Sequence, residues 1–429
     1  MAHWKLLLRR LVRQIWFRIT LFCLGGFAAA FAALLLQPYI PEDIAISVGA
    51  DSVGNILGIL AASMLTVTTF SLTTMVSAFA SASSNLTPRA TQLLMEDTTA
   101  QNALATFLGA FLYSIVGIVA LSTGTYGSTG RLVLLAVTIL VIIFIVVTLL
   151  RWISRLTKLG TVRETIEQLE EATSSALSRW CRHPHLRAAP RLDWIRMARA
   201  VYPAEIGYVQ NIDVEKLASI VEGRDVLIDV DVLPGAFVEP TRPVAYVDEE
   251  MSDEDIDRVR RAFLIGGRRT YEQDPRFGLI ALGEVASRAL SPAINDPGTA
   301  IDVINAGVRI LALYGGRSAE EEDIAFPKVR MPALSTADMM EDFFVPIARD
   351  GAGLVEVGIK LQKALQSLSR LSPEVFGRLA EEYSDDALRR AAKSLDEDRD
   401  LERVRRHAPT HPPEQIAPKS VAYPGSQAR

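Results

Sequence analysis

Hydroxyl side chains are concentrated in one apolar segment of this 429-residue chain, from about residue 53 to residue 84. At about 100° per residue, seven of them fall on a single helical face. They are Ser63, Thr66, Thr73, Thr74, Ser77, Ser81 and Ser84. Such a stripe lets two helices pack closely, or it lines a wetted path for a solute. Ser and Thr also donate to backbone carbonyls one turn earlier, so packing and a pore both remain open as interpretations.

A helix breaker follows the hydroxyl face. Pro88 lacks a backbone N–H and restricts the residue before it, so a helix should end at or before Thr87. We expect Asn85, Pro88 and Arg89 to form a gate or coupling element on the cytoplasmic side. A plain helix cap and connector is the alternative.

A second candidate site lies in the linker 291–299. Asp296 followed by Pro297 is typical of a helix start, where free amide groups can hold an anion. With Arg288 just before the linker, Arg288, Asn295 and Asp296 form a candidate anion or ligand site. Rigid packing of two helices around a tight turn explains the same residues.

Signatures of enzyme chemistry and of metal binding are missing from the sequence. It has no nucleophile elbow, Walker loop, dinucleotide fingerprint or HExxH string. Two cysteines, Cys23 and Cys181, are too few for a disulfide scaffold, and no second cluster completes a zinc site beside His183 and His185. We therefore expect no catalytic residue, metal or cofactor. The formal net charge of −5 argues against nucleic-acid binding.

Four apolar stretches can position the hydroxyl face within a membrane, because about 20 apolar residues cross a bilayer as a helix. They cover about residues 15–36, 53–80, 103–121 and 132–150. Only Arg18 is ionised, near a helix end where it can snorkel, and this argues against an ion-coupled pump. A signal peptide is the competing interpretation of the first stretch. Its apolar run to Leu36 exceeds the roughly 7–15 residues of a signal core.

The basic residues indicate the orientation of these stretches. Lys5, Arg9 and Arg10 precede the first stretch, and Arg151 and Arg155 follow the fourth. The two loops between stretches one and two and between three and four are nearly free of Lys and Arg. The positive-inside rule therefore predicts that both termini are cytoplasmic.

The rest of the chain is charged and mixed in pattern. We expect a transmembrane domain over residues 1–152, a connecting helix over 153–200 and a small β-rich module over 201–250. An α-helical or mixed module over 251–350, C-terminal helices over 351–406 and a disordered tail over 407–429 follow. The predicted fold class is a membrane all-α domain of four transmembrane helices, followed by a cytosolic α+β region.

Four polar residues predict helix starts in this cytosolic region: Asp213, Ser252, Asp274 and Asp296. The helix after Ser252 is expected to include Phe263. A mixed stretch containing Pro346 is expected before residue 351.

Several strings together resemble one family. They are Ser83–Arg89, Gly109–Tyr113, Gly207–Gln210 and Ser291–Pro297. The chain is similar over about residues 10–400 to bacterial predicted integral membrane proteins grouped as a domain of unknown function. The resemblance implies a bacterial inner-membrane protein with several N-terminal spans and a cytosolic remainder. It implies no activity and no functional residue.

Three functions fit these observations. The first is a homo-oligomeric channel or passive transport protein, lined by the hydroxyl face and gated by the cytosolic region. The second is a membrane-anchored sensor or regulator that binds a cytosolic protein partner. The third is a membrane-surface enzyme acting around Arg288, Asn295 and Asp296, which the missing motifs disfavour.

Overall fold

The computed structural model describes residues 17, 19–25, 28, 31, 50–85, 87–95, 98–123, 128–191, 199–248, 251–316 and 324–409. They form two compact units, one ending at Glu164 and the other beginning at Thr165. The predicted disordered tail therefore lies almost wholly outside the described residues.

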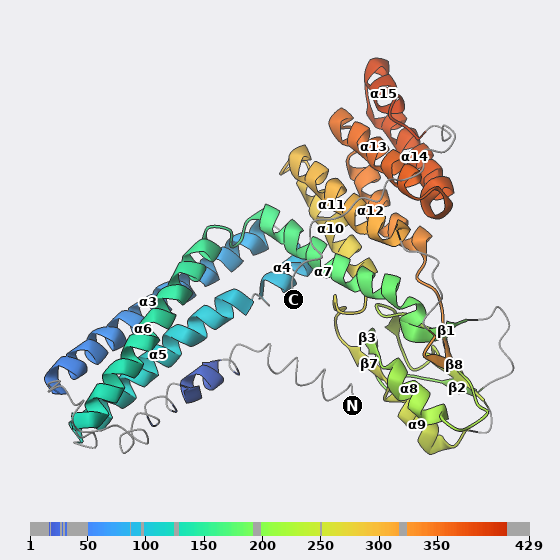
Figure 1. Ribbon diagram of the computed structural model, residues 1–429. Coiled ribbons are helices and arrows are strands. Elements are labelled where there is room, and N and C mark those ends of the chain that lie inside the picture. The colour runs from blue at the N-terminus through green and yellow to red at the C-terminus, as the bar shows by residue number, and fades with distance from the viewer. Residues whose placement is uncertain are drawn as a thin grey trace. The chain divides into compact units, whose positions relative to one another are not determined.

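Long helices make up most of the described part of the first unit (Figure 1). They are α3 (Ala50–Asn85), α5 (Thr98–Ser122) and α6 (Ser128–Leu156), and the short helix α4 (Pro88–Met95) follows α3 in the chain. Three of their segments are long and apolar enough to cross a membrane: Ser52–Ser83, Thr99–Ser122 and Gly130–Leu156. Most of the first predicted span, residues 15–36, lies outside the described residues, which include a helical piece over 19–25.

The three long helices share an apolar core. Leu60 and Met64 of α3, Phe107 of α5, and Ile145 and Trp152 of α6 all belong to one buried cluster. Gly117 of α5 lies against Leu57 of α3, and a Cβ on this glycine would lie 2.9 Å from Leu57 Cδ1, so the leucine side chain would have to move. The Tyr113 hydroxyl joins α5 to α6 through a 2.9 Å hydrogen bond with Thr138.

The chain does not continue as one helix beyond α6. We expected a connecting helix across 153–200; instead α6 ends at Leu156 and α7 covers Val162–Arg182. Gly160 lies between them with φ +80°, a left-handed conformation that glycine adopts without steric cost. Apolar residues keep a helical spacing on both sides of this break, so periodicity by itself did not reveal it.

The second unit contains two sheets with the orders β1-β8-β4-β6-β2 and β5-β3-β7. Their strands are β1 (Ala188–Pro190), β2 (Arg199–Val201), β3 (Gly207–Ile212), β4 (Ile228–Val230), β5 (Phe237–Val238), β6 (Ala245–Val247), β7 (Phe263–Gly266) and β8 (Phe326–Met331). The β-rich module expected over 201–250 thus also draws strands from before and after it. β8 pairs in parallel with both β1 and β4, a long-range pairing that local alternation does not encode.

Helices make up the rest of this unit (Figure 1). Besides most of α7, they are η3 (Pro184–Arg187), α8 (Val214–Val221), α9 (Asp253–Arg260), α10 (Pro275–Ala289), α11 (Pro297–Gly315), α12 (Thr336–Asp350), α13 (Val355–Leu371), α14 (Pro373–Ser394) and α15 (Asp398–Arg405). Asp213, Ser252, Asp274 and Asp296 each accept a backbone N–H at the predicted helix starts. The four capping predictions are confirmed.

Two local expectations were wrong. Helix α9 stops at Arg260, and Phe263 lies in β7, where it pairs with Ile212 of β3. A four-residue apolar spacing fits a helix, but the ladder with β3 decides the conformation. Pro346 lies inside α12 rather than in an irregular stretch, although a proline removes one helical hydrogen bond.

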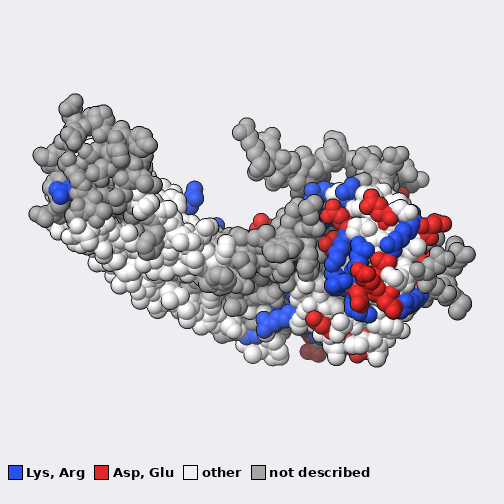
Figure 2. Space-filling model, turned by 90° about the horizontal axis from the view of Figure 1, so that it is seen from below, with Lys and Arg blue, Asp and Glu red and all other residues white. Residues whose placement is uncertain are grey.

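Charge separates the two units. Figure 2 shows the described helices of the first unit covered almost entirely by residues other than Lys, Arg, Asp and Glu. Charges of both signs alternate over the face of the second unit in that view. The first unit has a surface suited to lipid, and the second has one suited to water.

Candidate functional site

Helix α3 has two faces of opposite character. One face is buried and includes Leu57, Leu60, Met64 and Met75. The predicted hydroxyl face is on another side. The described side chains of Ser63, Thr66, Thr73, Ser77 and Ser81 are exposed, and Thr74 is partly buried. The seventh member, Ser84, has a side chain outside the described residues. Within this unit, then, the hydroxyl face is not used to pack α3 against α5.

The threonine hydroxyls on this face bond to the helix itself. Thr66 donates to the Ala62 carbonyl at 2.9 Å, Thr73 to the Thr69 carbonyl at 3.0 Å, and Thr74 to the Phe70 carbonyl at 2.9 Å. Each donor is satisfied inside the helix, so the face can lie in an apolar environment without a lost hydrogen bond. The oxygen lone pairs remain available to accept from water or from another helix.

Phe70 interrupts the polar character of this face, and the sequence analysis did not identify it. It lies four residues after Thr66 and four before Thr74, so it shares their face, and it is 64% exposed. The spacing of Phe70 from Thr66 and Thr74 in the sequence already places it on this face.

One hydroxyl of α3 faces the opposite way. Ser71 is fully buried, and its Oγ has no hydrogen-bond partner within the described part of the chain. Because a buried unpaired hydroxyl is costly, Ser71 is a weak point in the packing of α3.

The helix break predicted before Pro88 is present, and the gate or coupling role of Asn85, Pro88 and Arg89 stays a prediction. Helix α3 ends at Asn85 and α4 starts at Pro88, with the Thr87 hydroxyl accepting the Ala90 N–H at 3.4 Å. Pro88 and Arg89 are exposed. The Asn85 side chain lies outside the described residues, so its role remains a prediction.

The end of α3 contacts the turn that follows α6. A Cβ on Gly160 would lie 3.0 Å from the Ala78 carbonyl oxygen. An ion pair between Arg155 and Glu164 spans the same turn. Glycine at this position therefore permits close contact between the last turns of α3 and the exit of α6.

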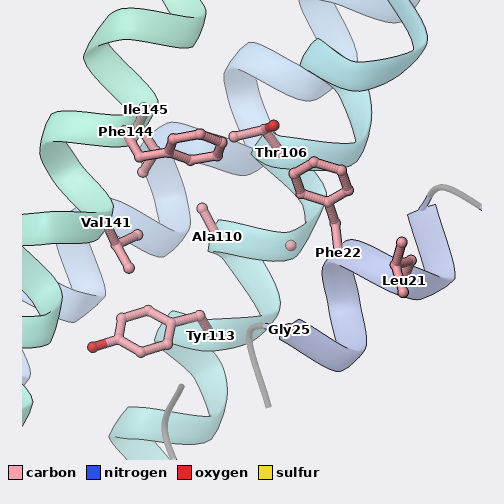
Figure 3. A pocket seen from close by; sticks show the side chains of 10 residues that line it. Leu21, Phe22, Gly25, Thr106, Ala110, Tyr113, Val141, Phe144 and Ile145 are labelled. Carbon is pink, nitrogen blue, oxygen red and sulfur yellow. The ribbon is translucent and has the colours of Figure 1, made fainter. Parts of the chain in front are cut away.

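An apolar cavity of about 350 Å³ lies between the helical piece over 19–25, α5 and α6 (Figure 3). Leu21, Phe22 and Gly25 line one side, Ala110 lines the α5 side, and Val141 and Phe144 line the α6 side. The rings of Phe22 and Phe144 stack with centroids 6.5 Å apart. A Cβ on Gly109 would lie 3.0 Å from the Phe22 carbonyl oxygen, so this glycine sets the approach of the helical piece.

The linker between α10 and α11 has a clear structural role. Asp296 accepts the Thr299 N–H at 3.1 Å and the Thr299 hydroxyl at 2.6 Å. These bonds hold the pKa of Asp296 below its usual range. Asn295 adopts φ +50°, and the Asp296 N–H donates to the Ala289 carbonyl at 2.8 Å. The carboxylate of Asp296 thus occupies the helix N-terminus itself, and a ligand role for Arg288, Asn295 and Asp296 stays a prediction.

Among the described residues, no group of three His, Cys, Asp or Glu side chains converges.

Comparison with known proteins decides the family. The model of the family described as Predicted membrane protein (DUF2254) matches residues 12–367. The chain belongs to the DUF2254 family. This DUF2254 protein is a membrane protein whose apolar helices precede a mixed α/β unit.

Relatives of this DUF2254 protein occur in mycobacteria. Proteins of Mycobacterium bovis and Mycobacterium tuberculosis, each titled uncharacterized, are 28% identical over 271 residues. The match covers 58% of this chain and 50% of each relative, so the aligned part spans about half the length of the curated relatives. No solved structure matches the chain.

Proposed function

We propose that this DUF2254 protein is a homo-oligomeric channel or passive transport protein of a bacterial inner membrane. The observation that carries the proposal is the hydroxyl face of α3, which stays largely exposed among the described residues of this unit. Several copies placed with this face inward would surround a path of hydroxyl oxygens. Four spans with both termini in the cytoplasm would present the second unit to the cytosol as a gating domain.

The length of α3 supports a path that continues past the bilayer. Its 36 residues extend about 54 Å at 1.5 Å per residue, against a hydrocarbon core of about 30 Å. Ala78 contacts Gly160, which follows Arg151 and Arg155 in the chain, and charged side chains favour the membrane surface. The end of α3 would therefore project from the membrane, and Thr66 would lie within the hydrocarbon.

Phe70 would form an apolar constriction in this path. A ring on the same face as Thr66 and Thr74 narrows a pore and can close it by excluding water. The proposal therefore predicts that shortening this side chain increases transport.

Flux through liposomes containing purified full-length protein tests the pore. We expect Phe70→Ala to raise the flux of small ions or neutral solutes, and Thr66→Leu to reduce it. Leu72→Ala is the matched control, because Leu72 is an exposed apolar residue of α3 that lies off the hydroxyl face. No flux with the wild-type protein, or equal flux with Phe70→Ala and Leu72→Ala, would refute the channel.

Cysteine accessibility separates a pore from a packing surface. In a background with Cys23 and Cys181 replaced by Ser, Thr66→Cys should react with a charged thiol reagent, because the reactive thiolate forms only where water enters. Leu72→Cys should not react. If Thr66→Cys forms a disulfide between copies but resists the reagent, the face packs subunits together. The sensor that binds a cytosolic partner then becomes the better account.

A further inference from the structure

The cavity in the first unit lies midway along two of the candidate membrane spans. Its α5 lining, between Thr106 and Tyr113, is central to the candidate span Thr99–Ser122. Its α6 lining, between Val141 and Ile145, is central to the candidate span Gly130–Leu156. The cavity is partly open, and its volume of about 350 Å³ falls within the roughly 300–1,000 Å³ of ligand pockets.

The polar groups at the cavity wall are already paired. Thr106 donates to the Asn102 carbonyl at 2.8 Å, and the Tyr113 hydroxyl is 2.9 Å from Thr138 Oγ1. The remaining described lining is aliphatic, aromatic or glycine. A water molecule needs two to four polar partners, so the wall favours an apolar occupant.

Two glycines of the cavity wall have opposite surroundings. Gly25 lines the cavity and is itself exposed, and no atom lies within 4 Å of the position that a Cβ would take on it. Gly109 meanwhile keeps the Phe22 backbone close to α5. The space beside Gly25 therefore lies next to the close contact between Gly109 and Phe22, and a flexible alkyl chain suits such a space.

We propose that this cavity binds one acyl chain of a bilayer phospholipid. Acyl chains are the apolar molecules present in the bilayer core. A bound acyl chain would supply the van der Waals contacts that the side chains lining an empty cavity lack. The bound chain contacts Leu21 and Phe22 on one side and Val141 and Phe144 on the other. It thereby links the first helical piece to α5 and α6. The site does not depend on the proposed pore.

Native mass spectrometry of the full-length protein, purified in mild detergent, tests the site. We expect one phospholipid per protomer with the wild-type protein. Gly25→Leu places a side chain in the open space, and Val141→Phe fills the cavity from α6. Each should lower lipid occupancy about tenfold or more, the factor expected when about two methylene groups lose their burial.

Leu24→Phe is the matched control, because Leu24 is an exposed neighbour in the same helical piece. It should retain lipid as the wild-type protein does. Undiminished phospholipid in both filled variants, or no retained phospholipid with the wild-type protein, would overturn the proposal. A free fatty acid as the retained mass would overturn the phospholipid as its source.

Discussion

At the residue scale, a turn of the second unit brings Gly235 close against the buried Asp274. Gly235 has φ +93°, and a Cβ there would lie 2.1 Å from Asp274 Oδ2. Asp274 caps α10 and accepts from Arg269 Nε at 2.7 Å and Nη2 at 3.0 Å. Burial raises the pKa of Asp274, while the hydrogen bonds from Arg269 oppose this shift. The turn after β4 therefore fits only because residue 235 has no side chain.

Gly235→Ala should destabilise the second unit strongly. The new Cβ adds backbone strain and displaces Asp274 from its bonds with Arg269. We expect the free energy of unfolding to fall by about 2–4 kcal/mol and Tm to fall by about 5–10 °C for a unit of this size. Circular dichroism of the detergent-purified chain during heating measures this shift.

Gly223→Ala is the matched control for that variant. Gly223 also has a positive φ, +73°, but nothing lies within 4 Å of its Cβ position. Gly223→Ala should lower the free energy of unfolding by only about 1–2 kcal/mol, the backbone strain of a non-glycine residue in this conformation. Equal losses at the two glycines would contradict the proposed clash with Asp274.

At the element scale, helix α9 depends on a cluster around one carboxylate. Asp255 accepts from Arg224 Nη1 at 2.5 Å, from Ser252 Oγ at 3.1 Å and from Arg258 Nη1 at 3.1 Å. These contacts, led by the hydrogen bond from Arg224, hold the pKa of Asp255 below its ordinary value. The cluster joins α9 to the segment that follows α8.

The sign of this shift predicts a pH dependence. A carboxylate whose pKa is lower in the folded state stabilises that state above its unfolded pKa of about 3.9. The stabilisation is lost as pH falls through the lower, folded pKa. Asp255→Asn should therefore lower Tm at pH 7, and its difference from the wild-type protein should shrink towards pH 3.

Asp253→Asn provides the comparison in the same turn of α9. Asp253 is largely exposed and pairs with Arg199 at the surface, where ion pairs contribute little. Its Tm should follow that of the wild-type protein across the same pH range. A constant difference between Asp255→Asn and the wild-type protein from pH 3 to pH 7 would contradict the assigned cause.

At the scale of the whole molecule, the basic residues at the end of α6 and just after it predict the side of the membrane on which the second unit lies. Arg151, Arg155 and Lys158 favour the cytoplasm. Alkaline phosphatase fused after Trp180 should therefore be inactive in cells, whereas a fusion within residues 124–127 should be active. The reverse pattern of activity would contradict the orientation and, with it, a cytosolic gating domain.

The sequence by itself determined the elements that depend on local chemistry. Apolar runs define α3, α5 and α6, because backbone groups in lipid must be satisfied within one helix. Pro88 separates α3 from α4, and side chains such as Asp274 and Asp296 begin helices by accepting nearby N–H groups. The hydroxyl face of α3 followed from helical spacing in the same way.

Only the tertiary structure decided features that join residues distant in sequence. Strand β8 pairs with β1 and β4, and Phe263 pairs with Ile212, which are partners far along the chain. The lack of space for a side chain at Gly235 likewise depends on Asp274, a residue far along the chain. The cavity beside Gly25 likewise forms only when three helical segments meet and leave space between their side chains. Local patterns encode conformation and amphipathicity, whereas long-range packing selects which surfaces meet and which gaps remain.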